Sequence, residues 1–316
     1  MIRRVGTAIA RPRPWLAVML LSTLAGSAAA QQVADSAFAP GIPRPAFAAD
    51  RGPVVLLDEA HFNFHTAGGR YLPFARLLRR DGFVVRPLST RFTRQALAGA
   101  RALVIANALA ERNRTEWSLP TPSAFAPEEI TAVRDWVREG GALLLIADHM
   151  PFPGAAGDLA AAFGVTLLNG YAQEAGGGGP IVFRRSDGSL ASHPITDGRV
   201  PEERVDSVVS FTGEAFRGGE ASSLMVLRPG STIYFPAVAG QFTDSTPSAP
   251  VAGLLQGAAL PSGRGRVAVF GEAAMFSAQL AGPDRQPMGM NAPLAGQNPQ
   301  FLLNVMHWLV GILPER

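Results

Sequence analysis

The sequence predicts an α/β protein with an open, mainly parallel central sheet that is covered by helices on both faces. Two observations support this prediction. Short, uncharged apolar runs recur along the chain, as is typical of parallel strands that are buried on both sides. Amphipathic stretches of helical period alternate with these runs, which favours helix crossovers between parallel strands. The chain has 316 residues, enough for one large domain or two small ones.

The strands are predicted from the apolar runs, each bounded by polar residues or glycine. A continuous run of this kind has no polar side for solvent, so both of its faces must be covered. Four runs are predicted as buried strands and a shorter one as an additional strand. They span residues 54–57, 102–106, 142–147 and 266–270, with the shorter run at 83–85.

The helices are predicted from their spacing and from their end signals. One spans 72–80, with Pro73 in its first turn and Gly82 just after its end. A second begins at Pro127 and ends at the glycine pair 140–141, and a third is expected over 159–163. The last helix begins at 298 and is predicted to bury Trp308 while His307 lies on its exposed side.

The pattern changes between about residues 169 and 263, where short β-like runs replace the strand–helix alternation. Such runs occupy 205–211, 223–227 and 232–235, and Pro229-Gly230 predicts a hairpin turn between the last two. We interpret this region as a β-rich insertion within one domain that spans 52–316. A loose leader is expected over 31–51.

The first thirty residues have the features of a secretory signal peptide. Four arginines precede the apolar run 15–25, which is shorter than a membrane-spanning helix, and Ala28-Ala29-Ala30 fits a cleavage site. We therefore expect cleavage after Ala30 and a periplasmic or secreted protein with no membrane span. Cleavage leaves 24 of the 28 basic residues against 25 acidic ones, so the sequence pI near 10.1 does not indicate a nucleic-acid partner.

The composition excludes several kinds of chemistry. All 28 basic residues are arginine, and the chain contains neither lysine nor cysteine. A Schiff-base lysine, a P-loop lysine, a cysteine nucleophile, a disulfide and a thiolate zinc site are therefore all impossible.

Several longer segments resemble a known superfamily. The stretch FAPEEITAVRDWVREGGALLLIADH (125–149) resembles the helix–glycine–strand segment of class I glutamine amidotransferase-like domains. With VLLDEAHFNFHT (55–66), HPIT (193–196), GRVAVFGEAAMF (265–276) and NPQFLLNVMHWL (298–309), it more narrowly resembles bacterial DUF4350 proteins and their relatives in gliding motility and intraflagellar transport. The resemblance implies a flavodoxin-like three-layer fold with a pocket at the strand ends. It does not imply glutaminase activity, because Asp148-His149-Met150 stands where that superfamily has its cysteine nucleophile.

The candidate site residues follow the predicted strands directly. Ligands in open parallel sheets bind beyond the carboxyl ends of the strands, so polar residues at those ends are expected to meet. The candidates come from the ends of the first, fourth and last predicted strands: Asp58, Glu59, His61, Asn63, His65, Asp148, His149 and Glu272.

Three interpretations of these residues stay open on sequence alone. In the first, the candidate residues cap helices and hold loops. In the second, they form a metal-free pocket for a small polar, sugar-like ligand. In the third, they bind a divalent metal for hydrolysis. For the metal, the candidate ligands are His61, His65, Asp148 and His149. The leading hypothesis is an exported protein that binds a small polar ligand. The alternatives are a metal-assisted hydrolase and an accessory or scaffolding protein with a protein partner.

Overall fold

The computed structural model describes residues 32–175, 177–219 and 221–315, and its centre is a nine-stranded sheet. Five parallel strands run in the order β3-β2-β4-β5-β15, which is the flavodoxin order 2-1-3-4-5. Antiparallel strands β14, β10 and β6 extend the sheet past β15, and β11 also pairs with β14. The bounds are β2 (Val54–Asp58), β3 (Val84–Leu88), β4 (Ala102–Ala106), β5 (Ala142–Ile146), β6 (Thr166–Leu167), β10 (Phe216–Arg217), β11 (Ser222–Val226), β14 (Leu255–Ser262) and β15 (Gly265–Phe270).

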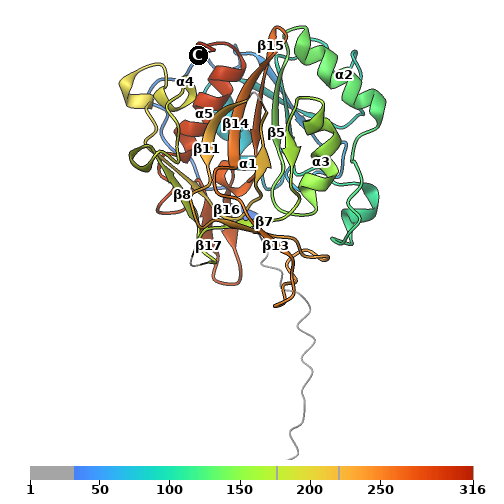
Figure 1. Ribbon diagram of the computed structural model, residues 1–316. Helices are drawn as coiled ribbons and strands as arrows, with labels where there is room; N and C mark the ends of the chain where they lie inside the picture. Colours follow the sequence, from blue (N-terminus) through green and yellow to red (C-terminus); the bar gives the residue numbers. More distant parts are fainter. Residues whose placement is uncertain (1–31, 176, 220, 316) are drawn as a thin grey trace, which may run out of the picture.

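The prediction of a mainly parallel, three-layer α/β fold is confirmed. Residues of the central strands alternate between two hydrophobic clusters, one on each face of the sheet. Helices α1 (Leu72–Arg80) and α5 (Asn298–Leu309) pack on one face, and α2 (Pro127–Arg138) and α3 (Phe152–Ala161) pack on the other. Figure 1 shows α5 and α3 on opposite sides of the sheet.

The helix starts match the prediction at three of the four main helices, including α5, which begins at Asn298. Helix α1 occupies 72–80 as predicted, and Gly82 adopts a φ of 93°, which favours glycine over residues with a side chain. Helix α2 begins at Pro127 and ends just before Gly140. Helix α3 begins at Phe152, earlier than the predicted 159–163, because its first six residues, FPGAAG, contain a proline and two glycines that do not read as helical but that the helix accommodates in its first turns.

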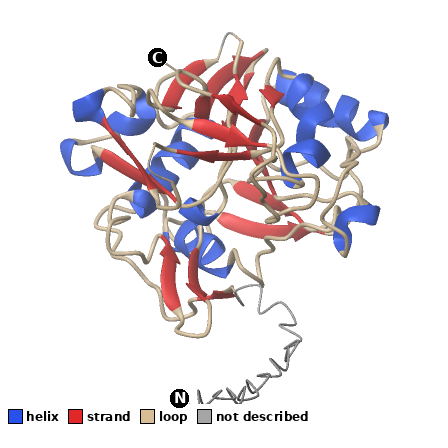
Figure 2. Ribbon diagram, turned by 60° about the horizontal axis from the view of Figure 1, so that its bottom comes forward, coloured by secondary structure: helices blue, strands red, loops and turns tan. Residues whose placement is uncertain are grey.

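The β-rich insertion is present, but its pairing differs from the prediction. Strand β12 (Thr232–Tyr234) pairs with β13 (Ser248–Pro250) and β7 (Tyr171–Gln173), whereas β11 pairs with β14 of the central sheet. The predicted hairpin at Pro229-Gly230 is therefore wrong: the turn is there, but the strands on either side of it belong to different sheets. Strands β8 (Ile181–Arg184) and β9 (Ser207–Ser210) form a further antiparallel pair. Figure 2 colours all strands of the molecule red.

Helix α5 is buried on all sides, which corrects the prediction for His307. Its side chain is fully buried, and its Nε2 lies 2.6 Å from Oδ2 of Asp81 at the end of α1. Trp308, predicted as buried, is 1% exposed.

The short helix α4 (Pro194–Asp197) packs against α5, and His193 caps it by accepting a hydrogen bond from the N–H of Ile195.

The segment expected to be a loose leader contacts the rest of the domain. Strand β1 (Val33–Ala34) pairs with β16 (Ala278–Ala281), which in turn pairs with β17 (Gln286–Gly289). Phe38, Ile42 and Phe47 pack against the core. The predicted signal peptide over 1–30 lies outside the described residues. Within the described ranges, no helix is long and apolar enough to cross a membrane.

Candidate functional site

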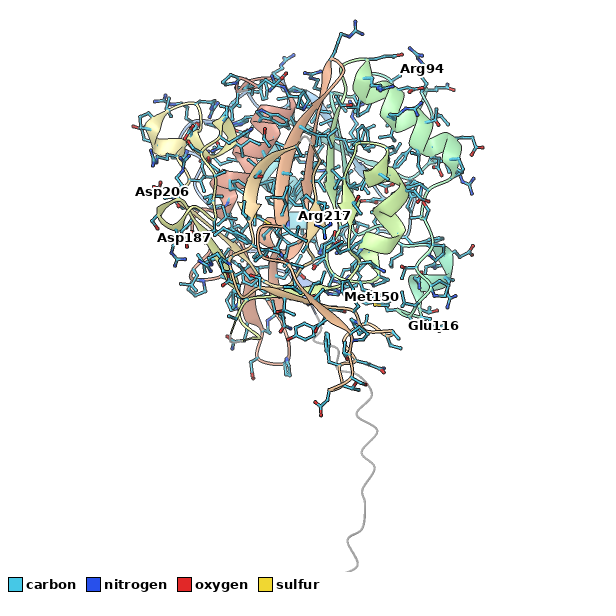
Figure 3. All side chains as sticks on the ribbon, viewed as in Figure 1. Arg94, Glu116, Met150, Asp187, Asp206 and Arg217 are labelled. Carbon is cyan, nitrogen blue, oxygen red and sulfur yellow. The ribbon has the colours of Figure 1, made fainter. Side chains whose placement is uncertain are left out.

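The carboxyl ends of four parallel strands bring polar side chains to one edge of the sheet. Asp58 is the last residue of β2, Asn107 directly follows β4, Asp148 follows β5 and Glu272 follows β15. Figure 3 labels Met150, two residues after Asp148, toward the lower end of the molecule. Asn107 joins neighbouring strand ends, since its Oδ1 accepts the N–H of Asp148 and its carbonyl accepts the N–H of Phe64.

One group at this edge forms a closed network around His61, which we call the His61 cluster (Asp58, His61, Asn63 and Glu129). Nδ1 of His61 lies 2.9 Å from Oδ1 of Asp58, and its Nε2 lies 3.0 Å from Oε1 of Glu129. Asn63 donates to Asp58 over 3.0 Å. The imidazole also packs against the rings of Phe92 and Phe125, at 4.5 and 4.8 Å between centroids. Both ring nitrogens are therefore used within the protein.

The electrostatics of the His61 cluster favour an imidazolium between two carboxylates. Burial lowers the pKa of His61, but the hydrogen bonds and charges of Asp58 and Glu129 outweigh it and raise the pKa above its usual value. Burial raises the pKa of Glu129, but N–H groups of Ala126 and Phe92, together with His61, bring it below its usual value. The cluster ties the loop after β2 to the first turn of α2, which is a structural role.

A second group, the acid cluster, consists of the carboxyl groups of Asp148, Glu214 and Glu272. Asp148 is 7% exposed, and the two glutamates are fully buried. The carboxyl group of Glu272 accepts the N–H groups of Ala274 and Met275, each over 2.7 Å. In the described ranges, the arginine ion pairs all involve other carboxylates, so none neutralises this cluster.

Gly213 and Gly271 allow the segments of Glu214 and Glu272 to lie side by side. The N–H of Glu214 donates to the carbonyl of Gly271 over 2.8 Å. A Cβ at Gly213 would collide with that same carbonyl and would lie 3.1 Å from Cβ of Glu272. The close approach of these segments therefore requires glycine, and it brings a residue of the β-rich insertion to the end of β15.

Burial makes the acid cluster hold its protons more tightly than ordinary carboxyl groups. Burial raises the pKa of Glu214 and of Glu272 well above the usual range, and the charge of Asp148 adds to both shifts. Burial also raises the pKa of Asp148, although hydrogen bonds and His149 oppose the shift. Glu214 uses only Oε2, which accepts the N–H groups of Leu168 and Asn169, while its Oε1 is buried without a partner.

His65 lies beside the acid cluster with neither ring nitrogen hydrogen-bonded. It is 2% exposed, and its ring packs 4.5 Å from that of Tyr71. The Tyr71 hydroxyl donates to the carbonyl of Ala273, the residue after Glu272. Burial, with the charges of Arg70 and His149, lowers the pKa of His65 to about 3, so the imidazole is neutral. A buried polar group without a protein partner is uncommon and indicates strain, a bound water or ion, or a functional role.

Aromatic rings lie around His149, the residue after Asp148. His149 is half-buried, and its ring stacks on Tyr171 at 4.3 Å and 13° between planes. Tyr171 contacts Phe242, which is 45% exposed, and Trp117 lies near His149. We call this set, Trp117, His149, Tyr171 and Phe242, the aromatic rim.

The structure divides the sequence-predicted site residues between these groups. Asp58, His61 and Asn63 belong to the His61 cluster. His65, Asp148, His149 and Glu272 lie at or beside the acid cluster. Glu59 joins neither, because its Oε1 accepts the N–H of Ala67. In the described ranges, no three histidine, aspartate or glutamate side chains are arranged to hold a metal ion. The hollow lined by Arg138, Phe163 and Gly263 lies at the opposite edge of the sheet.

Sequence reasoning missed several members of the site. Glu129 occupies the third position of α2, where a glutamate that accepts the N–H of Ala126 is a common helix-start feature, so that signal was available. Glu214 and Tyr171 come from the insertion and follow no strand of the parallel set. Only their tertiary contacts reveal them.

Several solved structures are similar to this chain. The N-terminal domain of mmIFT52 superposes with a TM-score of 0.55 and 14% identity, over 81% of this chain and 97% of that chain. A putative ThuA-like protein from Bacteroides uniformis gives a TM-score of 0.45 at 13% identity, over 88% of this chain and 96% of that chain. The cytoplasmic protein STM1381 from Salmonella typhimurium LT2 gives 0.47 at 18% identity, over 81% of this chain and 98% of that chain.

These likenesses concern the fold alone, since all identities are below 25%. The first match and the 2-1-3-4-5 strand order together identify a flavodoxin-like fold. No protein-family model matches the sequence, and no curated protein matches it either. Membership of the DUF4350 group therefore stays a prediction.

Proposed function

We propose that the protein binds a small polar ligand at the carboxyl ends of β5 and β15. The observation that carries this proposal is the acid cluster with His65 beside it: three buried carboxyl groups without an arginine partner in the described ranges, and a buried imidazole with both nitrogens unused. Such groups cost stability unless something binds them, because their hydration is lost on folding. A fold that keeps them at the usual ligand edge of a flavodoxin-like sheet favours a binding role.

Access to the cluster leads past the aromatic rim. Asp148 and the half-buried His149 are the outermost members, so a ligand meets them before it reaches the two glutamates. Flat rings beside carboxyl groups suit a sugar-like or polyol ligand, which presents an apolar face and several hydroxyl groups. The His61 cluster takes no part, because its hydrogen bonds are complete within the protein.

Isothermal titration with glucose, sorbitol and glucosamine at millimolar concentration tests this proposal. Saturable binding of at least one compound is expected, with an affinity at least tenfold weaker in Asp148→Asn. The exposed Glu128 on α2 provides a matched control, since Glu128→Gln removes a charge outside the acid cluster and is expected to leave binding unchanged. If none of the three compounds binds to the wild-type protein, the proposal fails.

Export is the second part of the proposed function. The basic segment, the short apolar run and Ala28-Ala29-Ala30 support a signal peptide that is removed before residue 31. We also propose, from the sequence segments that resemble them, that the protein is related to the DUF4350 proteins. N-terminal sequencing of the protein from the periplasm or culture medium is expected to begin at Gln31. A chain that keeps residues 15–25 in the membrane fraction would contradict the export proposal.

A further inference from the structure

We propose that helix α1 binds an anionic phospholipid at a membrane surface through three arginines, Arg76, Arg79 and Arg80, which we call the arginine face. This site is separate from the strand-end site and does not depend on the ligand proposed there. Three observations lead to it: the arginines lack counter-charges, two of them are held in place by the fold, and an apolar hollow lies beside them.

The three arginines share one face of α1 because of their spacing. Arg76 forms an i, i+3 pair with Arg79 and an i, i+4 pair with Arg80, and side chains at these spacings are neighbours on a helix. All three are exposed, and none forms an ion pair within the described ranges. The carbonyl end of the helix favours Arg79 and Arg80, which lie in its last turn, but it does not account for Arg76. Like charges at these spacings repel, and a bound anion would offset that repulsion.

The carboxylates next to this face along the chain have other partners. Asp81, directly after the helix, is fully buried and lies 2.6 Å from Nε2 of His307. Asp35, which precedes the N-terminal segment that contacts α1, accepts hydrogen bonds from the N–H of Ala37 and from the side-chain amide of Asn291. Neither carboxylate forms an ion pair with the arginine face, so the positive charge of this face is available to a ligand.

Backbone carbonyl groups hold two of the arginines in place. Arg76 donates to the carbonyl of Ser36 over 2.6 Å, and Arg79 donates to the carbonyl of Val85 over 3.1 Å. A guanidinium group has five N–H donors, so each of these arginines keeps donors for an anion. Their positions are set before the ligand arrives, which reduces the entropy lost on binding.

An apolar hollow lies beside the arginine face, between α1 and the N-terminal segment 36–40. Its volume is about 220 Å³, and its apolar lining includes Phe38 and Pro40 from the segment and Leu77 from the helix. Sites that enclose a drug-sized ligand measure roughly 300–1,000 Å³. This hollow is smaller, so it suits one part of a molecule whose remainder stays outside the protein, as a lipid does when it is anchored in a membrane.

An anionic phospholipid matches both the charge and the hollow. Guanidinium groups bind phosphate oxygens through pairs of parallel hydrogen bonds, and apolar side chains suit the carbon atoms next to the phosphate. Several arginines on one exposed face attract an anionic membrane together, and salt weakens this attraction. Segment 36–40 follows the predicted cleavage site at Ala30 closely, so the proposed export route also brings this face to a membrane surface.

Co-sedimentation with lipid vesicles tests the proposal. The purified protein is mixed at low salt with vesicles of phosphatidylcholine alone or of phosphatidylcholine with an equal amount of phosphatidylglycerol. Its partition coefficient is expected to be at least about tenfold higher on the anionic vesicles, and the difference should shrink at high salt. Equal partitioning on both kinds of vesicle, or no binding to either, would overturn the proposal.

A triple variant locates the binding on the arginine face. Arg76→Gln/Arg79→Gln/Arg80→Gln should lower partitioning on the anionic vesicles at least about tenfold. The matched control is Arg138→Gln/Arg184→Gln/Arg217→Gln, which removes the same charge from three exposed arginines that form no ion pair in the described part of the chain and should leave partitioning within about twofold of wild type. Equal losses in the two variants would show that net charge rather than this face attracts the membrane.

Two further measurements keep the proposal open to contradiction. Should the triple variant not fold, Arg80→Gln replaces it, since this side chain makes no hydrogen bond within the described ranges, and partitioning should fall about threefold. Titration with glycerol 1-phosphate distinguishes a soluble phosphate ester from a lipid. Weaker binding of this compound than of the vesicles is expected, because it lacks the acyl chains and the membrane surface. Binding of glycerol 1-phosphate without binding of anionic vesicles would overturn the lipid assignment.

Discussion

Two histidines four residues apart, His61 and His65, differ completely in their surroundings. His61 has a carboxylate on each ring nitrogen, whereas His65 has no partner on either. The sequence shows both as equivalent members of one polar segment. They differ because the loop after β2 directs the two side chains to different helices. His61 points toward α2 and bonds to Glu129, whereas His65 points toward α1 and packs against Tyr71. Partners that lie distant in the sequence could not be foreseen from the local pattern.

His61→Ala is expected to lower the free energy of unfolding by about 3–5 kcal/mol, because it leaves Asp58 and Glu129 buried without their shared partner. The pKa of His61 is raised in the folded state. Its contribution is therefore complete below the unfolded pKa near 6.5 and is lost as the pH rises through the folded value. Urea unfolding at pH 6 and pH 9 measures the effect, which should be larger at pH 6.

His65→Leu provides the contrast on the same loop. Removing a buried imidazole without hydrogen bonds leaves no partner unpaired, so stability should stay within about 1 kcal/mol of wild type or rise. Urea unfolding at the same pH values measures the stability of this variant. A loss as large as that of His61→Ala would show that His65 has a structural partner and would remove the support it gives to the binding site.

At the scale of elements, the central strands were predictable and the insertion pairing was not. A strand covered on both faces must be apolar throughout, so its pattern is visible without knowledge of its neighbours. Strand β11 could pair equally well with β12 or β14 on local grounds, and in the structure it pairs with β14 of the central sheet. The predicted exposed side of helix α5 was wrong for a different reason. Its polar residues face the interior because each finds a buried partner, as Asn304 does on the carbonyl of Glu203 and His307 does on Asp81.

Two tryptophans predicted on inward helix faces differ in burial, and their stability effects should differ accordingly. Trp308 on α5 is 1% exposed, whereas Trp136 on α2 is only half-buried and covers Gly141. Trp308→Ala is expected to cost about 3–5 kcal/mol, and Trp136→Ala clearly less, about 1–2 kcal/mol. Equal shifts of the urea midpoint would show that the covering of the sheet by α2 depends on Trp136 more than its burial indicates.

For the whole molecule, the carboxyl-end edge of the sheet holds one cluster that stabilises the fold and one that destabilises it. The His61 cluster joins the loop after β2 to α2, while the acid cluster next to it holds three carboxyl groups that would be better hydrated in the unfolded chain. The flavodoxin-like strand order brings both to one edge, and that much follows from the sequence through the strand-end rule. The division into two clusters could not be predicted from the sequence, because Glu129 and Glu214 come from segments outside the parallel strands.

The acid cluster makes the stability of the whole molecule depend on pH in a definite direction. The pKa values of Asp148, Glu214 and Glu272 are raised in the folded state, above all by burial. The folded protein therefore retains protons that the unfolded chain releases above its pKa of about 4. Their contribution is fully present below that pH and is lost as the pH rises through the folded values. The free energy of unfolding should fall between pH 5 and pH 8, by up to about 1.4 kcal/mol per pH unit for each proton.

Glu214→Gln separates this effect from that of His61. The amide keeps an oxygen for Leu168 and Asn169 and places its nitrogen where Oε1 has no partner, so no hydrogen bond is lost. The variant should therefore unfold at higher urea than wild type at pH 8 and should show a shallower decline from pH 5 to pH 8. Glu128→Gln, an exposed substitution of the same kind, should leave the slope unchanged. Parallel pH profiles for Glu214→Gln and wild type would mean that Glu214 is ionised in the folded protein at pH 5, and the raised pKa assigned to Glu214 would then be wrong.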